Sequence, residues 1–190
     1  MIKKLLVVLF LLFKVSTVFA SENIAGDSAK MGVLTRGPLA QKVSYKAFVL
    51  EENRKRKAIE EVLSRSGSPM MYAVDAFLAN CKIYRFDCYF LPAISGLESQ
   101  FGNYVYPGSY NPFGWNGGYA IFRSWEDAIA RVAEGIQTRY IQAGLSTIEE
   151  IGSRYAESPT WAARVRGYMG TLEAEESKNQ LYFDDSALQL

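Results

Sequence analysis

The 190-residue chain is long enough for one domain with its own hydrophobic core. Hydrophobic residues make up 49% of the chain and aromatic residues 14%, so most of the chain is expected to be globular rather than disordered. The net charge is only +1, which gives no electrostatic reason to expect a nucleic acid as partner. Histidine is absent, which excludes a Ser-His-Asp triad, a Cys-His pair and any metal site ligated by histidine.

The first 20 residues have the pattern of a secretory signal peptide. Two lysines precede an apolar run over residues 5–13, and Val18 and Ala20 form a small-residue cleavage site. The run is short for a membrane span and Lys14 interrupts it, so an uncleaved N-terminal anchor is the less favoured alternative. We therefore expect a secreted or cell-envelope protein. Without this segment the chain has 18 basic and 20 acidic residues, a net charge of about −2.

Residues 21–45 are polar, lack a clear period and are expected to link the signal to the domain. Apolar residues at helical spacing predict a helix over residues 52–65, and Ser68-Pro69 is typical of the start of the next. The only two cysteines, Cys81 and Cys88, bracket the turn that follows this second helix. In an exported protein such a pair favours a disulfide, with two buried thiols as the alternative.

Residues 91–102, LPAISGLESQFG, are predicted to form the helix around which the chain is organised. At about 100° per residue, Glu98 lies at the margin of one apolar stripe, formed by Phe90, Ile94, Leu97 and Phe101. Burial against apolar groups disfavours a charged carboxylate, and a carboxyl group that keeps its proton can act as a general acid. The alternative is a Glu98 that reaches water or pairs with an arginine.

Residues 103–124 are rich in Gly, Pro, Asn and aromatic residues. Gly117-Gly118 between two apolar runs predicts a tight β-hairpin. Aromatic side chains in this lobe either stack on sugar rings or fill a small core, and we expect Trp115 and Tyr119 to be exposed. The predicted fold is α+β and mostly helical, with a short β-hairpin lobe and a groove beside it that suits an extended polymer.

Three further helices are predicted after the hairpin. Ser124 caps the first, so Glu126 and Asp127 are interpreted as helix-starting acids first and as catalytic candidates second. Ser146-Thr147 begins a short helix and Ser158-Pro159 begins the last. The predicted domain then spans residues 46–176, and residues 177–190 are expected to form a flexible tail.

Four elements, GLESQFG, SYNPFGW, FRSWEDAI and SRYAESPTWAARVRGYM, occur in this order. Together they resemble the bacterial endo-β-N-acetylglucosaminidase family, of the autolysin and flagellar peptidoglycan hydrolase type, over about residues 68–169. The resemblance implies a lysozyme-like fold with Glu98 as the catalytic general acid and Tyr155 facing it across the cleft. It also implies a structural floor for the cleft, formed by Asn111, Phe113 and Gly114. We expect further substrate contacts from Ser99, which flanks Glu98, and from Trp115 and Tyr119.

One feature departs from the family pattern: many members carry a second acid in the β-lobe, whereas residues 103–125 contain no Asp or Glu. Three schemes stay open: a nucleophilic acetamido group of the substrate, a water held by Tyr155, or a lytic transglycosylase with a single Glu. We expect an exported, monomeric β-1,4 glycosidase acting on peptidoglycan or a related GlcNAc-containing glycan, without cofactor or metal. The alternatives are a non-catalytic wall-binding protein on the same fold and an exported interaction domain.

Overall fold

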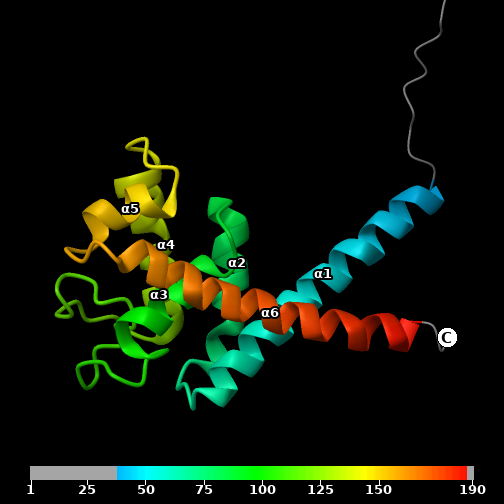
Figure 1. Ribbon diagram of the computed structural model, residues 1–190, viewed down its shortest axis with the longest axis horizontal. Coiled ribbons are helices and arrows are strands. Elements are labelled where there is room, and N and C mark those ends of the chain that lie inside the picture. The colour runs from blue at the N-terminus through cyan, green and yellow to red at the C-terminus, as the bar shows by residue number, and fades with distance from the viewer. Residues whose placement is uncertain (1–37, 188–190) are drawn as a thin grey trace, which may run out of the picture. The chain divides into compact units, whose positions relative to one another are not determined.

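The computed structural model describes residues 38–187. The predicted export signal, residues 1–20, and the first part of the predicted linker lie outside the described residues. Within the described range the chain forms helices joined by turns and loops (Figure 1). In chain order these are α1 (Pro38–Arg65), the 3-10 turn η1 (Met71–Ala73), α2 (Val74–Tyr84), α3 (Phe90–Ser99), α4 (Trp125–Ile136), the π-helical turn η2 (Gln137–Ile141), α5 (Ile148–Tyr155) and α6 (Trp161–Ala187).

Helix α3 lies in the centre of the core. All of its residues are buried except Leu97 and Glu98, so burial includes the polar Ser95 and Ser99 and is not limited to one apolar stripe. The long helix α6 packs against α3, α5 and α1, and α2 packs against α4 (Figure 1). The helix that carries Glu98 is therefore held by its neighbours, and only its C-terminal end reaches the surface.

The predicted β-hairpin is wrong. None of the residues in the range 38–187 forms a strand, and residues 103–123, here called the loop lobe, are turns and irregular loop. Backbone φ is positive at Gly114 and Asn116, in the run before the predicted Gly117-Gly118 turn, whereas paired strands need φ near −120° to −140°. The amide of Gly118 instead donates to the carbonyl of Gly114 at 3.0 Å, so the chain coils back on itself. The mostly helical class is compatible with the structure, but the β part of the predicted fold is not found.

The first and last helices are longer than expected. Helix α1 begins at Pro38, inside the predicted linker, and α6 continues to Ala187, through residues expected to be a tail. Just before the extension, the buried Glu175 accepts a hydrogen bond from Arg65 of α1 at 2.8 Å. Within the extension, the buried Asn179 donates to the Glu61 carboxylate of α1 at 3.5 Å. Because these segments lack a continuous apolar stripe, the periodicity that predicts helices did not detect them.

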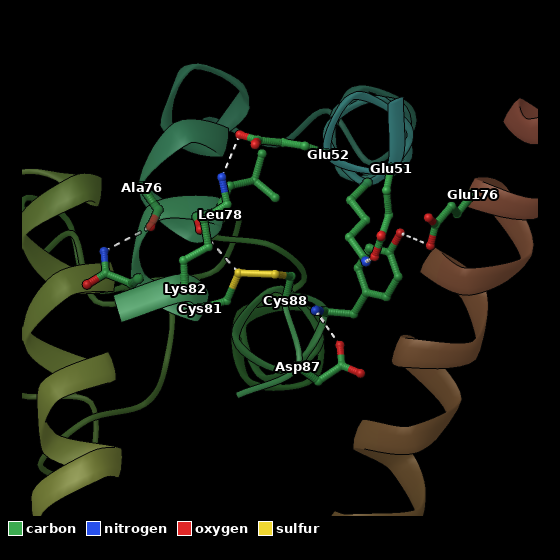
Figure 2. The surroundings of a disulfide bond; sticks show 12 residues. Glu51, Glu52, Ala76, Leu78, Cys81, Lys82, Asp87, Cys88 and Glu176 are labelled. Atoms are coloured by element: carbon green, nitrogen blue, oxygen red, sulfur yellow. Dashed lines mark hydrogen bonds and ion pairs between the residues drawn. A yellow bond between two sulfur atoms is a disulfide. The ribbon is translucent and has the colours of Figure 1, made fainter. Parts of the chain in front are cut away.

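A disulfide joins the end of α2 to the start of α3. Cys81 and Cys88 are bonded, with their Cα atoms 4.9 Å apart (Figure 2). Beside the disulfide, Lys82 pairs with Glu52 of α1 at 2.6 Å. The Asp87 carboxylate accepts the amide hydrogen of Tyr89 at 2.8 Å and so orders the first turn of α3. The disulfide thus lies at the opposite end of α3 from Glu98.

Replacing both cysteines by alanine is expected to lower the free energy of unfolding by about 2 kcal/mol, because the unfolded chain is no longer constrained by the cross-link. Urea denaturation of the oxidised wild type and of the double variant measures this difference. Wild type treated with a reductant is the matched control and should behave like the variant. Equal stability of the variant and the oxidised wild type would contradict a formed disulfide.

The α1–α6 contact predicts a pH dependence of stability. The hydrogen bond from Arg65 lowers the pKa of Glu175 to about 2. Because the folded-state pKa is lowered, this contribution is present above the unfolded pKa of about 4.3 and is lost as the pH falls towards 2. Glu175→Gln should therefore lower Tm at neutral pH, and its difference from the wild type should shrink between about pH 4.5 and pH 2. Thermal melts across this range test the effect, with the exposed Glu173→Gln as control.

Candidate functional site

Glu98 lies at the point where α3 ends and the chain turns sharply towards the loop lobe. Three consecutive residues after Ser99 have positive φ: Gln100 at 48°, Phe101 at 58° and Gly102 at 84°. Non-glycine residues seldom adopt this conformation, and it persists where surrounding contacts determine it. Here the Ser68 hydroxyl donates to the Phe101 carbonyl at 2.6 Å, and both residues are buried. The turn therefore fixes the direction in which α3 presents Glu98.

The side chains of Ser99 and Asn111 hydrogen-bond the backbone of the loop lobe next to Glu98. The Ser99 hydroxyl is buried and donates to the carbonyl of Pro112 at 2.8 Å, which joins α3 to the loop lobe. Asn111 is also buried, and its amide group bonds both the N–H of Trp115 at 3.0 Å and the carbonyl of Trp115 at 2.9 Å. Ser99 was expected to contact substrate and Asn111 to form part of the cleft floor; in the structure the polar side-chain atoms of both bond within the protein.

Glu98 itself is exposed. The indole N–H of Trp161 donates to its Oε1 at 2.7 Å. Its Oε2 faces Gly114, where an added Cβ would lie 3.1 Å from that oxygen. The carboxyl group is therefore held by one oxygen, while the other lies against a residue without a side chain. Enclosure of the carboxylate by apolar side chains, which the sequence predicted, is not observed.

The position of Trp161 is set by α5. Trp161 is buried, and its ring stacks on Tyr155 with the centroids 4.8 Å apart and the planes inclined by 30°. The ring also lies flat against Gly152, where a Cβ would be 2.7 Å from Cε3. A buried indole N–H needs an acceptor, and the packing leaves Glu98 as its partner.

Tyr155 braces the loop lobe. Its hydroxyl donates to the carbonyl of Phe113 at 2.6 Å, and Phe113 is fully buried. Burial, the negative charge of Glu98 and the neighbouring Tyr140 raise the pKa of Tyr155 well above its usual range. The phenol therefore stays protonated and does not act as a base at neutral pH. Because Gly114 follows Phe113 directly, the Tyr155 hydrogen bond fixes the backbone that faces Glu98.

A pocket of about 170 Å³ lies between the loop lobe and the segment from η2 to α5. Gly114 and Tyr155 belong both to this pocket and to the surroundings of Glu98. The complete lining is Gly114, Trp115, Asn116, Gly117, Arg139, Tyr140 and Tyr155. Trp115 is half-buried and forms one wall, whereas Tyr119 is 82% exposed and is not part of the lining. Of the two aromatic residues expected at the surface, only Trp115 lines this pocket.

Sequence reasoning did not assign Trp161, Arg139 or Tyr140 to this site. Trp161 is buried, and its bond to Glu98 spans 63 residues, so no local pattern in the sequence indicates it. Arg139 and Tyr140 reach the pocket from the π-helical turn η2. Such turns occur often at functional sites, but no motif in this stretch marks one.

Within residues 38–187 no group of His, Cys, Asp and Glu is arranged to hold a metal ion. No helix of the same range combines the length and the apolar character that crossing a bilayer requires. Comparison with family models, with curated proteins and with solved structures found no match. The family resemblance therefore depends on the four sequence elements alone.

The contact between Gly114 and Glu98 predicts a non-additive pair of substitutions. Gly114→Ala should lower the free energy of unfolding by about 1–3 kcal/mol, because alanine is strained at φ 62° and its methyl group crowds Oε2 of Glu98. Gly118→Ala is the matched control: its φ is 87°, but a Cβ there meets nothing within 4 Å.

In the wild type, Gly114→Ala should lower the free energy of unfolding more than Gly118→Ala does. When Glu98 is also replaced by alanine, this difference between the two glycine variants should disappear. Denaturant unfolding of the single and double variants measures it. An excess that persists without the Glu98 side chain would contradict the contact.

Proposed function

We propose that the protein is an exported glycoside hydrolase that cleaves β-1,4 bonds of a GlcNAc-containing glycan, most favourably peptidoglycan, with Glu98 as general acid. The observation that carries the proposal is the setting of Glu98: Trp161 holds Oε1 at 2.7 Å, and Oε2 faces Gly114 at the edge of an aromatic pocket. A general acid needs a carboxyl group held in one orientation with one oxygen open to the substrate. The resemblance to the endo-β-N-acetylglucosaminidases supports the same function.

In the proposed reaction, Oε2 of Glu98 gives its proton to the glycosidic oxygen as the bond to the leaving sugar breaks. The carboxylate that forms keeps the hydrogen bond from the Trp161 indole, which strengthens when its acceptor becomes charged. Glu98 is exposed in the free protein, so the bound glycan is what covers it and excludes water. Tyr155 acts as a positioning residue, through its bond to the Phe113 carbonyl.

No Asp or Glu is among the lining residues of the pocket, and Glu98 itself lies beside the lining rather than in it. The pocket therefore offers no second carboxylate to work with Glu98. Asp127 is engaged elsewhere: it accepts hydrogen bonds from Arg123 at 3.0 Å and Arg131 at 2.9 Å, and these hold its pKa well below the usual range. The hydroxyl hydrogen of Tyr155 is already used on Phe113, which weakens the scheme in which Tyr155 donates to a water. An acetamido-assisted hydrolase and a lytic transglycosylase are the two schemes that fit this site.

Glu98→Gln should reduce the release of soluble fragments from purified sacculi by about 100-fold or more, because it removes the proton donor and keeps the shape. Glu126→Gln, an exposed acid in the first turn of α4, is the control and should release fragments at the wild-type rate. Mass spectrometry of the products then separates the two schemes: anhydro-sugar ends indicate a lytic transglycosylase and reducing ends a hydrolase. Unchanged release by Glu98→Gln would refute the proposal.

Trp161→Phe tests the hydrogen bond without removing the aromatic stack on Tyr155. The rate of release should fall by about tenfold, the usual worth of a hydrogen bond to a charged group. The stacked ring should keep Tm close to that of the wild type, so a loss of rate with a retained Tm separates the hydrogen bond from packing. Full activity in Trp161→Phe would show that the orientation of Glu98 does not depend on the indole.

The exposure of Glu98 favours one further candidate, a non-catalytic wall-binding protein that uses the same pocket. Such a protein would sediment with insoluble peptidoglycan and release nothing from it. The sacculus assay decides between the two functions, since only the enzyme generates new chain ends. The Cys81–Cys88 disulfide supports export in either case, because disulfides persist in oxidising compartments.

A further inference from the structure

One charged side chain borders the pocket beside Glu98. The guanidinium of Arg139 lies over the ring of Trp115, 5.3 Å from its centroid. Arg139 is the one charged residue in the lining of this pocket. No carboxylate of the described range lies within ion-pair distance of it. An arginine stacked on an aromatic ring keeps its N–H donors free at the edge of the guanidinium plane.

The fold holds this arginine and its platform in place. Trp115 packs closely against α4 at Gly135, where a Cβ would lie only 2.7 Å from Cζ2 of the indole. The main chain of Trp115 is fixed on its other side by the two hydrogen bonds to Asn111. One turn after Gly135, the π-helical turn η2 brings both Arg139 and Tyr140 to the pocket.

A second pocket on the other side of Trp115 and Arg139, of about 290 Å³, has a different charge pattern. Its lining includes Glu134, and its second arginine, Arg131, is already paired with Asp127 at 2.9 Å. Opposite charges therefore meet there, and an anion gains little. The lining of the pocket beside Glu98 holds Arg139 and no acidic residue, and Glu98 itself lies outside that lining. Charge complementarity therefore favours an anion at Arg139 on this side.

We propose that Arg139 binds a carboxylate carried by the substrate, so that the site selects an acidic amino sugar polymer over a neutral one. The ligand class is a β-1,4 glycan in which GlcNAc units carry an acidic ether or a peptide extending from it. The proposal rests on the proposed function, since it places the glycan in the same pocket. A guanidinium binds a carboxylate through two parallel N–H···O bonds, which gives both affinity and orientation.

The test is a binding comparison in the full chain carrying Glu98→Gln, so that turnover does not interfere. Titration calorimetry compares two ligands. One is a tetrasaccharide in which GlcNAc alternates with N-acetylmuramic acid, and the other is the neutral tetramer of GlcNAc. The acidic ligand should bind more tightly, and Arg139→Gln should reduce that preference by about tenfold, the worth of one hydrogen bond to a charged group. Arg139→Lys should retain part of the preference, because the charge remains but the planar fork is lost.

Arg164→Gln removes the same charge from an exposed position of α6 outside the pocket and should keep the preference. Thermal melts of each variant show whether the fold is retained. Gly135→Ala, which displaces Trp115, should weaken the preference for the acidic ligand although Arg139 is still present. Equal binding of the two ligands by the parent protein, or an unchanged preference in Arg139→Gln, overturns the inference.

Failure of the proposed function gives a different result. A protein that never releases fragments from sacculi but shows an Arg139-dependent preference binds acidic glycans without cleaving them. A protein that cleaves sacculi through Glu98 but has no Arg139-dependent preference is an enzyme that recognises its substrate elsewhere. The sacculus assay and the titrations therefore report separately on the two proposals.

Discussion

The hydrogen bond from Trp161 to Glu98 joins the first residue of α6 to the last turn of α3, and the other contacts of the site maintain it. Trp161 stacks on Tyr155, and Tyr155 bonds the Phe113 carbonyl next to Gly114. Gly114 in turn faces the second oxygen of the same carboxylate. These contacts form a closed ring of interactions that starts and ends at Glu98 and passes through α6, α5 and the loop lobe. The orientation of Glu98 therefore depends on the packing of α3, α5 and α6.

The loop lobe contributes to this ring although it has no regular secondary structure. Its fixed points are buried polar contacts, from Ser99 to the Pro112 carbonyl and from Asn111 to both backbone groups of Trp115. Loops placed by a rigid scaffold commonly carry functional residues, because their backbone can approach a ligand closely. Here the buried side chains act as supports, and the groups left free at the surface are one carboxyl oxygen and one guanidinium.

The sequence alone determined the features that depend on neighbouring residues. Ser124 caps α4 through the amide of Asp127 at 3.2 Å, and Thr147 and Glu150 form a capping box at the start of α5; both helix starts are confirmed. Cys81 and Cys88 are near in sequence and are bonded. The same local reasoning placed Glu98 on a core helix, because apolar spacing reports directly on helix faces. It carried that helix to Gly102, however, whereas α3 ends at Ser99.

Only the tertiary structure decided how Glu98 is held and what surrounds it. The loop lobe coils instead of pairing because Gly114 and Asn116, before the predicted turn, adopt positive φ, which composition does not reveal. The C-terminal part of α6 packs on α1 through a hydrogen bond between Arg65 and Glu175, which are 110 residues apart in the chain. The partner of the Trp161 indole and the place of Arg139 over Trp115 are likewise contacts between distant segments. Such contacts are set by packing geometry, and a linear pattern of residue types does not encode them.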